Sequence, residues 1–316
     1  TPSNSSAASD VYKRQLIYMS SVVEVKRVIK YPPEAFLYAS PIDLPAGEVK
    51  VSEYFVMSNY VYVLQGLSFA RTDNVRARLI IDDKERVTLD DLSAIAGIDY
   101  EETIKLPATK SMQVRLYTPS AVSNLQYRHR VLVMRASTLL KMRLGMALST
   151  RDVELRTKYM LDEALQTSIP EPFRLDWGVE EFRELAVKAT SSRSLRLAVP
   201  DGYKLIILGL SAERPANPAQ CYLNIERDDI PKVVDVDLYC LPSLQYTAPL
   251  RVVVTDKAVI NIDVKTSGTY RVRIIYGLGK ITIPEKIMWG IDLTGTERAI
   301  AEKYDLFDKI EAGVYS

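Results

Sequence analysis

Two stretches of this sequence resemble each other closely: KMRLGMALSTRDVELRTKYMLDEALQ at residues 141–166 and KIMWGIDLTGTERAIAEKYDLFDKIE at residues 286–311. They align without a gap at a constant shift of 145 residues. Similarity at such a long, fixed period is typical of an internal duplication. The identical pairs include Lys141 and Lys286, Gly145 and Gly290, Leu148 and Leu293, Lys158 and Lys303, Tyr159 and Tyr304, and Leu161 and Leu306.

The repeat continues toward the N-terminus in the same order, with a shift that varies between about 137 and 148 residues. The further matches are YPPEAF with SIPEPF, SNYVYVLQGLSFAR with DGYKLIILGLSAER, RARLIIDD with QCYLNIER, and YRHRVLV with YRVRIIY. The last match pairs His129 with Val272. We therefore predict two copies of one unit, in domains spanning 33–169 and 170–316, after an N-terminal arm at 1–32.

Segments of alternating character fill the first part of each copy. In YRHRVLV, Arg128 and Arg130 share one strand face, and in YRVRIIY, Arg271 and Arg273 take the same place. The opposite, inward faces carry Tyr127, His129, Val131 and Val133, and then Tyr270, Val272, Ile274 and Tyr276. Such segments, separated by Asp, Gly, Ser and Pro, predict a mainly β fold. We expect two tandem, similar antiparallel β-sandwich domains of jelly-roll type, each followed by an α-helix.

Each copy carries a helix start signal after its strands. A Ser or Thr that can accept from the backbone precedes an acid by three residues, which is the pattern of a capping box. These residues are Ser149 and Asp152 in the first copy and Thr294 and Glu297 in the second. Tyr159 follows Leu155, and Tyr304 follows Ile300, at the spacing of one helix face. We expect the second helix to be docked rather than frayed, either on its own sandwich or on an adjacent subunit, and a further helix around Val179–Val187.

Bulk composition favours a globular protein. The chain has 316 residues, 47% hydrophobic and 26% charged, with a formal net charge of +1 and a pI of about 7.6. No global field would attract nucleic acid or an anionic membrane, and no apolar run reaches the roughly 18 residues of a membrane helix. We expect cytoplasmic synthesis without a signal peptide. Residues 1–18 are Ser-rich and precede Met19; we interpret them as non-native upstream sequence, with a flexible arm as the alternative.

Side chains for catalysis or metal binding are few. His129 is the single histidine, and its inward position predicts a structural role. Cys221 and Cys240 are expected to be free, buried thiols, with a cross-link between strands as the alternative. We predict no catalytic residue, no metal site, no cofactor and no enzymatic activity. Calcium in the acidic turns is the alternative. Those turns carry Asp82, Asp83, Glu85, Asp90 and Asp91, and Glu226, Asp228, Asp229, Asp235 and Asp237.

The paired arginines and the repeated helix tyrosines are the candidate interface residues. The candidates are Arg128, Arg130, Arg271, Arg273, Tyr159 and Tyr304. Arg and Tyr are enriched at protein interfaces, and the chain has 19 Tyr against 6 Phe. The alternative for the arginines is a solvated sheet face with cross-strand acids. Abundant Arg, Glu and Lys also favour a thermophilic source.

A repeated sandwich with helical appendages resembles the tandem jelly-roll organisation of some viral capsid proteins. The stretches GYKLIILGLSAER and GTYRVRIIYGLG also look like β-modules of phage virion proteins. The resemblance implies a structural, homo-oligomeric subunit of a capsid or appendage, found in the virion or outside the cell. Its partners would be copies of itself and other virion proteins. The alternative is a carbohydrate-binding or host-attachment module that recognises surface glycans.

Overall fold

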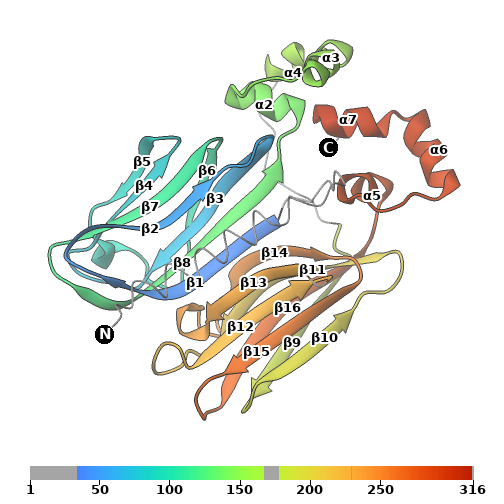
Figure 1. Ribbon diagram of the computed structural model, residues 1–316. Coiled ribbons are helices and arrows are strands. Elements are labelled where there is room, and N and C mark those ends of the chain that lie inside the picture. Colours follow the sequence, from blue (N-terminus) through green and yellow to red (C-terminus); the bar gives the residue numbers. More distant parts are fainter. Residues whose placement is uncertain (1–33, 167–177, 229, 315–316) are drawn as a thin grey trace.

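The computed structural model describes residues 34–166, 178–228 and 230–314. The predicted arm at 1–32, the stretch at 1–18 and the predicted boundary between 169 and 170 lie outside these ranges. Figure 1 shows two β-sandwiches side by side, with short helices grouped at one end. Within the described residues, no helix combines the length and the apolar character needed to cross a bilayer.

The first unit is a jelly roll. Its strands are β1 (Glu34–Leu44), β2 (Gly47–Phe55), β3 (Tyr60–Phe69), β4 (Arg76–Ile81), β5 (Lys84–Leu89), β6 (Glu102–Ala108), β7 (Ser111–Thr118) and β8 (Val122–Arg135). A 3-10 turn, η1 (Leu92–Ala94), precedes β6. The sheet orders are β6-β3-β8-β1 and β2-β7-β4-β5. The first strand therefore pairs with the eighth, the second with the seventh, the third with the sixth and the fourth with the fifth, antiparallel throughout. This nesting is the jelly-roll arrangement, and the predicted mainly β fold is confirmed.

The second unit repeats this order strand for strand. Its strands are β9 (Glu181–Ala189), β10 (Arg193–Ala198), β11 (Tyr203–Ala212), β12 (Cys221–Arg227), β13 (Ile230–Asp237), β14 (Ala248–Val254), β15 (Lys257–Val264) and β16 (Tyr270–Lys280), with η2 (Leu238–Cys240) before β14. The orders β14-β11-β16-β9 and β10-β15-β12-β13 match those of the first unit position by position. The two halves of the chain are therefore two copies of one topology.

The two units share one sheet, which the sequence did not predict. β1 of the first unit pairs antiparallel with β14 of the second at Ala35 and Arg251, so that eight strands form a single sheet. One face of β1 contributes Tyr38 to the first core, whereas Leu37 and Ala39 on its other face belong to the second core. β1 is therefore a structural part of both units.

Two separate apolar clusters fill the sandwiches. Buried residues such as Leu79 and Leu116 form the first core, and residues such as Ile225 and Ile260 form the second. Each fully buried aliphatic side chain of this size contributes about 1.5–3 kcal/mol. Cys221 and Cys240 are free and buried in the second core, as predicted.

The predicted single helix after each sandwich is wrong, because three short helices occur there. They are α2 (Thr138–Leu144), α3 (Thr150–Lys158) and α4 (Leu161–Gln166), then α5 (Ile283–Trp289), α6 (Gly295–Lys303) and α7 (Leu306–Ala312). Left-handed glycines, Gly145 and Gly290, end α2 and α5. Met160 and Asp305 have left-handed backbone conformations, which interrupt the helix again before α4 and α7. The predicted capping boxes at the starts of α3 and α6 are confirmed.

The predicted helix around Val179–Val187 is also wrong, since this segment forms β9. Leu185 and Val187 pack against the second core, and the backbone pairs with β16 from Leu278 to Tyr270. Helix-favouring Glu, Leu and Ala are overridden because β16 offers a ladder and the core offers a place for alternate side chains.

Candidate functional site

The candidate site is the junction between the two units, where one jelly roll recognises another. Beside the β1–β14 pairing, the amide of Gln126 donates from Nε2 to the Tyr239 carbonyl at 2.9 Å. The Arg128 guanidinium donates from Nη1 to the Cys240 carbonyl at 3.3 Å. Both acceptors lie on η2, so this short turn of the second unit lies against β8 of the first.

Arg128 is a buried part of this junction and does not lie on a solvated face. Its residue is 1% exposed, and its Nη2 also donates to the Ser68 hydroxyl at 3.1 Å. Burial lowers the pKa of Arg128 to about 10, opposed by the nearby Glu101 carboxylate. The solvated-sheet alternative is therefore wrong for Arg128, because η2 of the second unit covers that face.

Arg130 is also buried, and it is held by an acid that the sequence analysis missed. Its Nη2 lies 2.6 Å from Glu101 Oε1, and its Nη1 donates to Gln65 Oε1 at 2.7 Å. Gly66 makes room for this pair, since a Cβ there would lie 1.8 Å from Glu101 Oε1. Glu101 lies in the segment between η1 and β6, 29 positions from Arg130, and no local pattern in the sequence links the two.

The segment before β6 also reaches across to the second unit. Asp99 Oδ1 accepts from Arg214 Nη2 at 2.7 Å and from the Ser243 backbone N–H at 2.9 Å. Tyr100 donates its hydroxyl proton to the Tyr246 hydroxyl at 3.0 Å. The sequence analysis named none of these residues, because contacts over more than a hundred positions leave no spacing signal.

The C-terminal helix α7 completes the junction by docking on the helices of the first unit. Ala312 is fully buried in a cluster with Leu139, Leu155 and Leu161. This last segment is docked, as predicted, but on the first unit of the same chain and not on its own sandwich or another subunit. Figure 1 shows α7 beside α3 and α2, away from its own sandwich.

Charged groups surround this docked helix. Lys158 Nζ lies 2.8 Å from Asp305 Oδ2 and 2.7 Å from Asp308 Oδ2. Arg151 binds Asp308, and the Tyr159 hydroxyl donates to Asp305. These side chains are partly exposed to solvent, so such pairs orient α7 more than they stabilise it. Tyr159, a candidate interface residue, therefore lies at a contact between the two units.

The other candidates lie on the second unit and are more exposed. Arg271 binds Glu213 at 2.8 Å, and Arg273 binds Glu184 at 3.0 Å. Tyr304 is 53% exposed. The structure therefore brings Arg128 and Tyr159 to the internal junction and holds Arg130 on residues of the first unit. On the second unit, Arg271 and Tyr304 are exposed and Arg273 is partly buried. That these residues contact another subunit stays a prediction.

Comparisons with known proteins do not place the chain in a family. No family model and no curated protein matches it. Solved structures with distant likeness include the CUB1-EGF-CUB2 domain of human MASP-1/3, at 11% identity over 78% of this chain and 99% of that one, with a TM-score of 0.27. The turret protein A223 of Sulfolobus turreted icosahedral virus has 9% identity over 77% and 98%, with a TM-score of 0.19. Tomato vicilin has 9% identity over 86% and 85%, with a TM-score of 0.22. At such scores the likeness carries no argument about function.

The register of the sheets corrects one part of the predicted alignment. Tyr127 of β8 and Val272 of β16 occupy the same ladder position in the two units. β8 and β16 thus align at the shift of 145 that the helices show. His129 therefore corresponds to Ile274 and not to Val272.

His129 is a core residue of the first unit, as predicted. Its ring stacks on Tyr38 at 5.1 Å between centroids and lies edge-on to Tyr54, whose hydroxyl hydrogen-bonds to Nε2. Burial lowers its pKa to about 3, so the folded state keeps the ring neutral. A neutral, enclosed imidazole in an aromatic cluster serves packing.

We predict a pH-dependent stability from this group. The unfolded chain takes up a proton below the usual pKa of about 6.5, whereas the folded chain does not until about 3. The contribution of His129 to the free energy of unfolding is therefore fully present above about pH 6.5. Between about pH 6.5 and 3 it falls by about 1.4 kcal/mol for each unit by which the pH decreases. Urea unfolding of wild type and of His129→Ile, the residue found at the corresponding position, should differ in slope by this amount between pH 6 and 4.5. At pH 7.5 we expect the two to differ by about 1–2 kcal/mol or less. Parallel slopes would contradict the prediction.

The acidic turns use their oxygens on the backbone. Asp82 accepts from the N–H groups of Thr109, Lys110 and Ser111 at 2.7–3.1 Å. Asp228 does the same for Asp256 and Lys257 at 3.1 and 3.0 Å. Within the described ranges, no three His, Cys, Asp or Glu side chains gather in a way that could hold a metal ion. These acids fix turns, which is a sufficient structural reason for their positions.

Proposed function

We propose that this protein is a non-enzymatic structural subunit that self-assembles through its jelly-roll units, as part of a virion shell or appendage. The observation that carries the proposal is the internal junction. Two units of one topology are joined by a shared sheet, by polar contacts of Arg128 and Asp99, and by a docked helix. The fold therefore already binds a copy of itself within one chain.

Physical reasoning supports this role. The junction uses different surfaces of the two units, namely the β1 side of the first and the β14 side of the second. Such head-to-tail contacts can be repeated along a ring or a filament. Fusing two units in one chain removes the loss of translational and rotational freedom for every second contact. A building block of this kind suits a repetitive assembly.

The test is the native mass as a function of concentration. Light scattering after size exclusion, mass photometry and negative-stain microscopy should reveal species of several chains that increase with protein concentration. A mass of 35.6 kDa at every concentration would contradict the proposal. A persistent monomer that binds glycans on an array would favour the attachment-module alternative.

A further inference from the structure

Each of the two surfaces that form the internal junction has a counterpart on the other unit. By the matching sheet orders, β9 is the counterpart of β1, and β6 is the counterpart of β14. β1 and β14 pair at the centre of the eight-stranded sheet, whereas β9 and β6 are its two outer edges. The surface that the first unit offers to the second is thus present again on the second unit, and no strand of the described residues pairs with it there.

The edge strand β9 carries an exposed aromatic residue at the position that pairs with β14 in the internal junction. The register with β8 and β16 makes Phe182 the counterpart of Ala35, the residue that pairs with Arg251. Ala35 is 1% exposed and Phe182 is 70% exposed. An edge strand with an exposed hydrophobic residue is a ready site for pairing with another chain. On the same reasoning Lys105 of β6 corresponds to Arg251.

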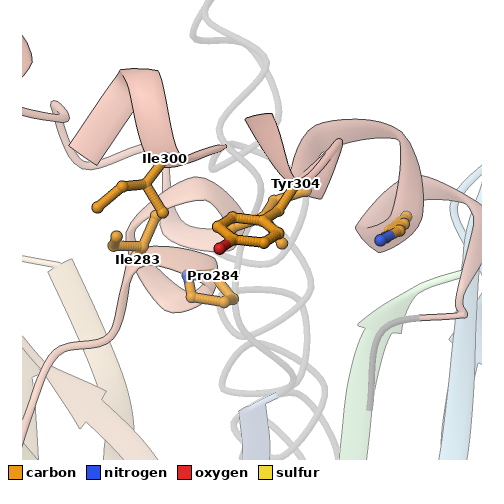
Figure 2. Close-up of a pocket in the computed structure, with 6 residues that line it drawn as sticks. Ile283, Pro284, Ile300 and Tyr304 are labelled. Atoms are coloured by element: carbon orange, nitrogen blue, oxygen red, sulfur yellow. The ribbon is translucent and has the colours of Figure 1, made fainter. Parts of the chain in front are cut away.

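The helices give a second, independent indication. The end of α7, from the second unit, covers Leu139 and Leu155 of the first unit. The counterparts of these two residues, Pro284 and Ile300, line an open apolar hollow of about 450 Å³ together with Tyr304. Figure 2 shows these side chains around a common space. Leu155 is fully buried, whereas Ile300 is 37% exposed.

The helical surfaces that would meet between two copies carry opposite charges, as the surfaces of the internal junction do. In the first unit Lys158 binds Asp308 of α7. The shift of 145 makes Lys303 the counterpart of Lys158 and makes Glu163 of α4 the counterpart of Asp308. Lys303 and Glu163 are both exposed. An α4 helix placed on the hollow would therefore bring a carboxylate to a lysine, as the internal junction does.

We propose that a second copy of this chain docks head to tail and repeats the internal junction. In this contact β9 of one copy pairs with β6 of the next, and the hollow beside Ile300 and Tyr304 receives α4 of that next copy. The proposal rests on the proposed function and names the surfaces of self-assembly. Because the two surfaces differ, an open row of copies always has one unoccupied surface at each end, and growth ends only if the row closes into a ring.

Two features set the expected strength. Arg183 and Glu184 stand where β1 has Phe36 and Leu37, so the contact between copies is more polar than the internal one. We expect it to be reversible and weakened by salt. Pro107 on β6 corresponds to Val253 of β14, whereas the residue pair that joins β1 to β14 lies two positions away, at Arg251. Pro107 therefore does not remove the expected pair at Lys105.

The experiment uses two full-length variants, each blocked at one surface. The β9-side variant carries Phe182→Lys and Tyr304→Asp, and the β6-side variant carries Lys105→Pro and Glu163→Ala, so that the two blocked surfaces do not attract each other in a mixture. We expect each alone to raise the dissociation constant of assembly by at least about 30-fold, the effect of losing a hot spot. Phe55→Lys, at an exposed aromatic on β2, is the matched control and should assemble like wild type. Thermal melting verifies that every variant is folded.

Mixing the two blocked variants gives the decisive readout. Each retains one intact surface, so an equimolar mixture should form dimers of two chains and no larger species. Dimers of the β6-side variant alone would instead indicate a two-fold contact and overturn the proposal. If wild type assembles and Phe182→Lys with Tyr304→Asp has no more effect than the control, the head-to-tail contact is refuted while the proposed function stands. A wild type that remains monomeric would refute both.

Discussion

The variant Glu285→Leu should unfold at a much lower urea concentration than wild type, with a loss of about 3–5 kcal/mol. Glu285 of α5 pairs with Lys204 of β11, whose side chain is essentially fully buried. Removing the carboxylate leaves an ammonium group in the core beside Trp289, whose ring centroid lies 5.8 Å from Nζ. An unpaired buried charge is among the most destabilising changes that a single substitution can make.

The double variant Lys204→Met with Glu285→Leu should recover most of this loss and lie within about 1–2 kcal/mol of wild type. The repeat supplies the reason, because the first unit has Val61 and Leu140, both buried, at the same two positions. An apolar pair is therefore compatible with this contact between strand and helix. Equilibrium urea unfolding followed by circular dichroism measures both variants. A double variant as unstable as the single one would mean that the ion pair has a role beyond charge compensation.

Asp152→Ala should be the second severe variant, again at about 3–5 kcal/mol. Asp152 accepts from Lys141 Nζ at 2.8 Å, from the Ser149 backbone at 2.8 Å and from the Thr138 hydroxyl at 2.8 Å. Burial alone would raise its pKa, but these hydrogen bonds lower it below its usual value. The stabilisation is therefore complete above about pH 4 and is lost as the pH falls below that. The gap between wild type and variant should shrink from pH 4 toward pH 2.

The matched control is Glu297→Ala in the second unit. Glu297 forms the same capping box and binds Lys286 at 2.7 Å, but its side chain is 23% exposed against 6% for Asp152. We expect the smaller effect from Glu297→Ala, because water can solvate the groups that it leaves. Thermal and urea unfolding of the two variants side by side provide the comparison. Equal losses would show that the helix cap, and not the buried ion pair, dominates the effect of Asp152.

The sequence by itself determined the features that depend on neighbours within a few positions. The duplication was visible because residues 141–166 and 286–311 keep their order, and the capping boxes were visible because Ser149 and Asp152 lie three apart. Alternation along YRHRVLV placed His129 inside the first sandwich. These signals are local because they follow from the periods of strands and helices.

Only the tertiary structure decided where each face is covered. Arg128 alternates outward from its own core as the pattern requires, yet it is buried because η2 of the second unit lies over it. The segment of β9 has helix-forming residues, yet it is a strand because β16 provides a ladder. The shared sheet depends on Ala35 meeting Arg251, more than two hundred positions away. Periodicity predicts which side chains share a face. Whether that face is buried depends on segments far away in the sequence, and periodicity does not predict their contacts.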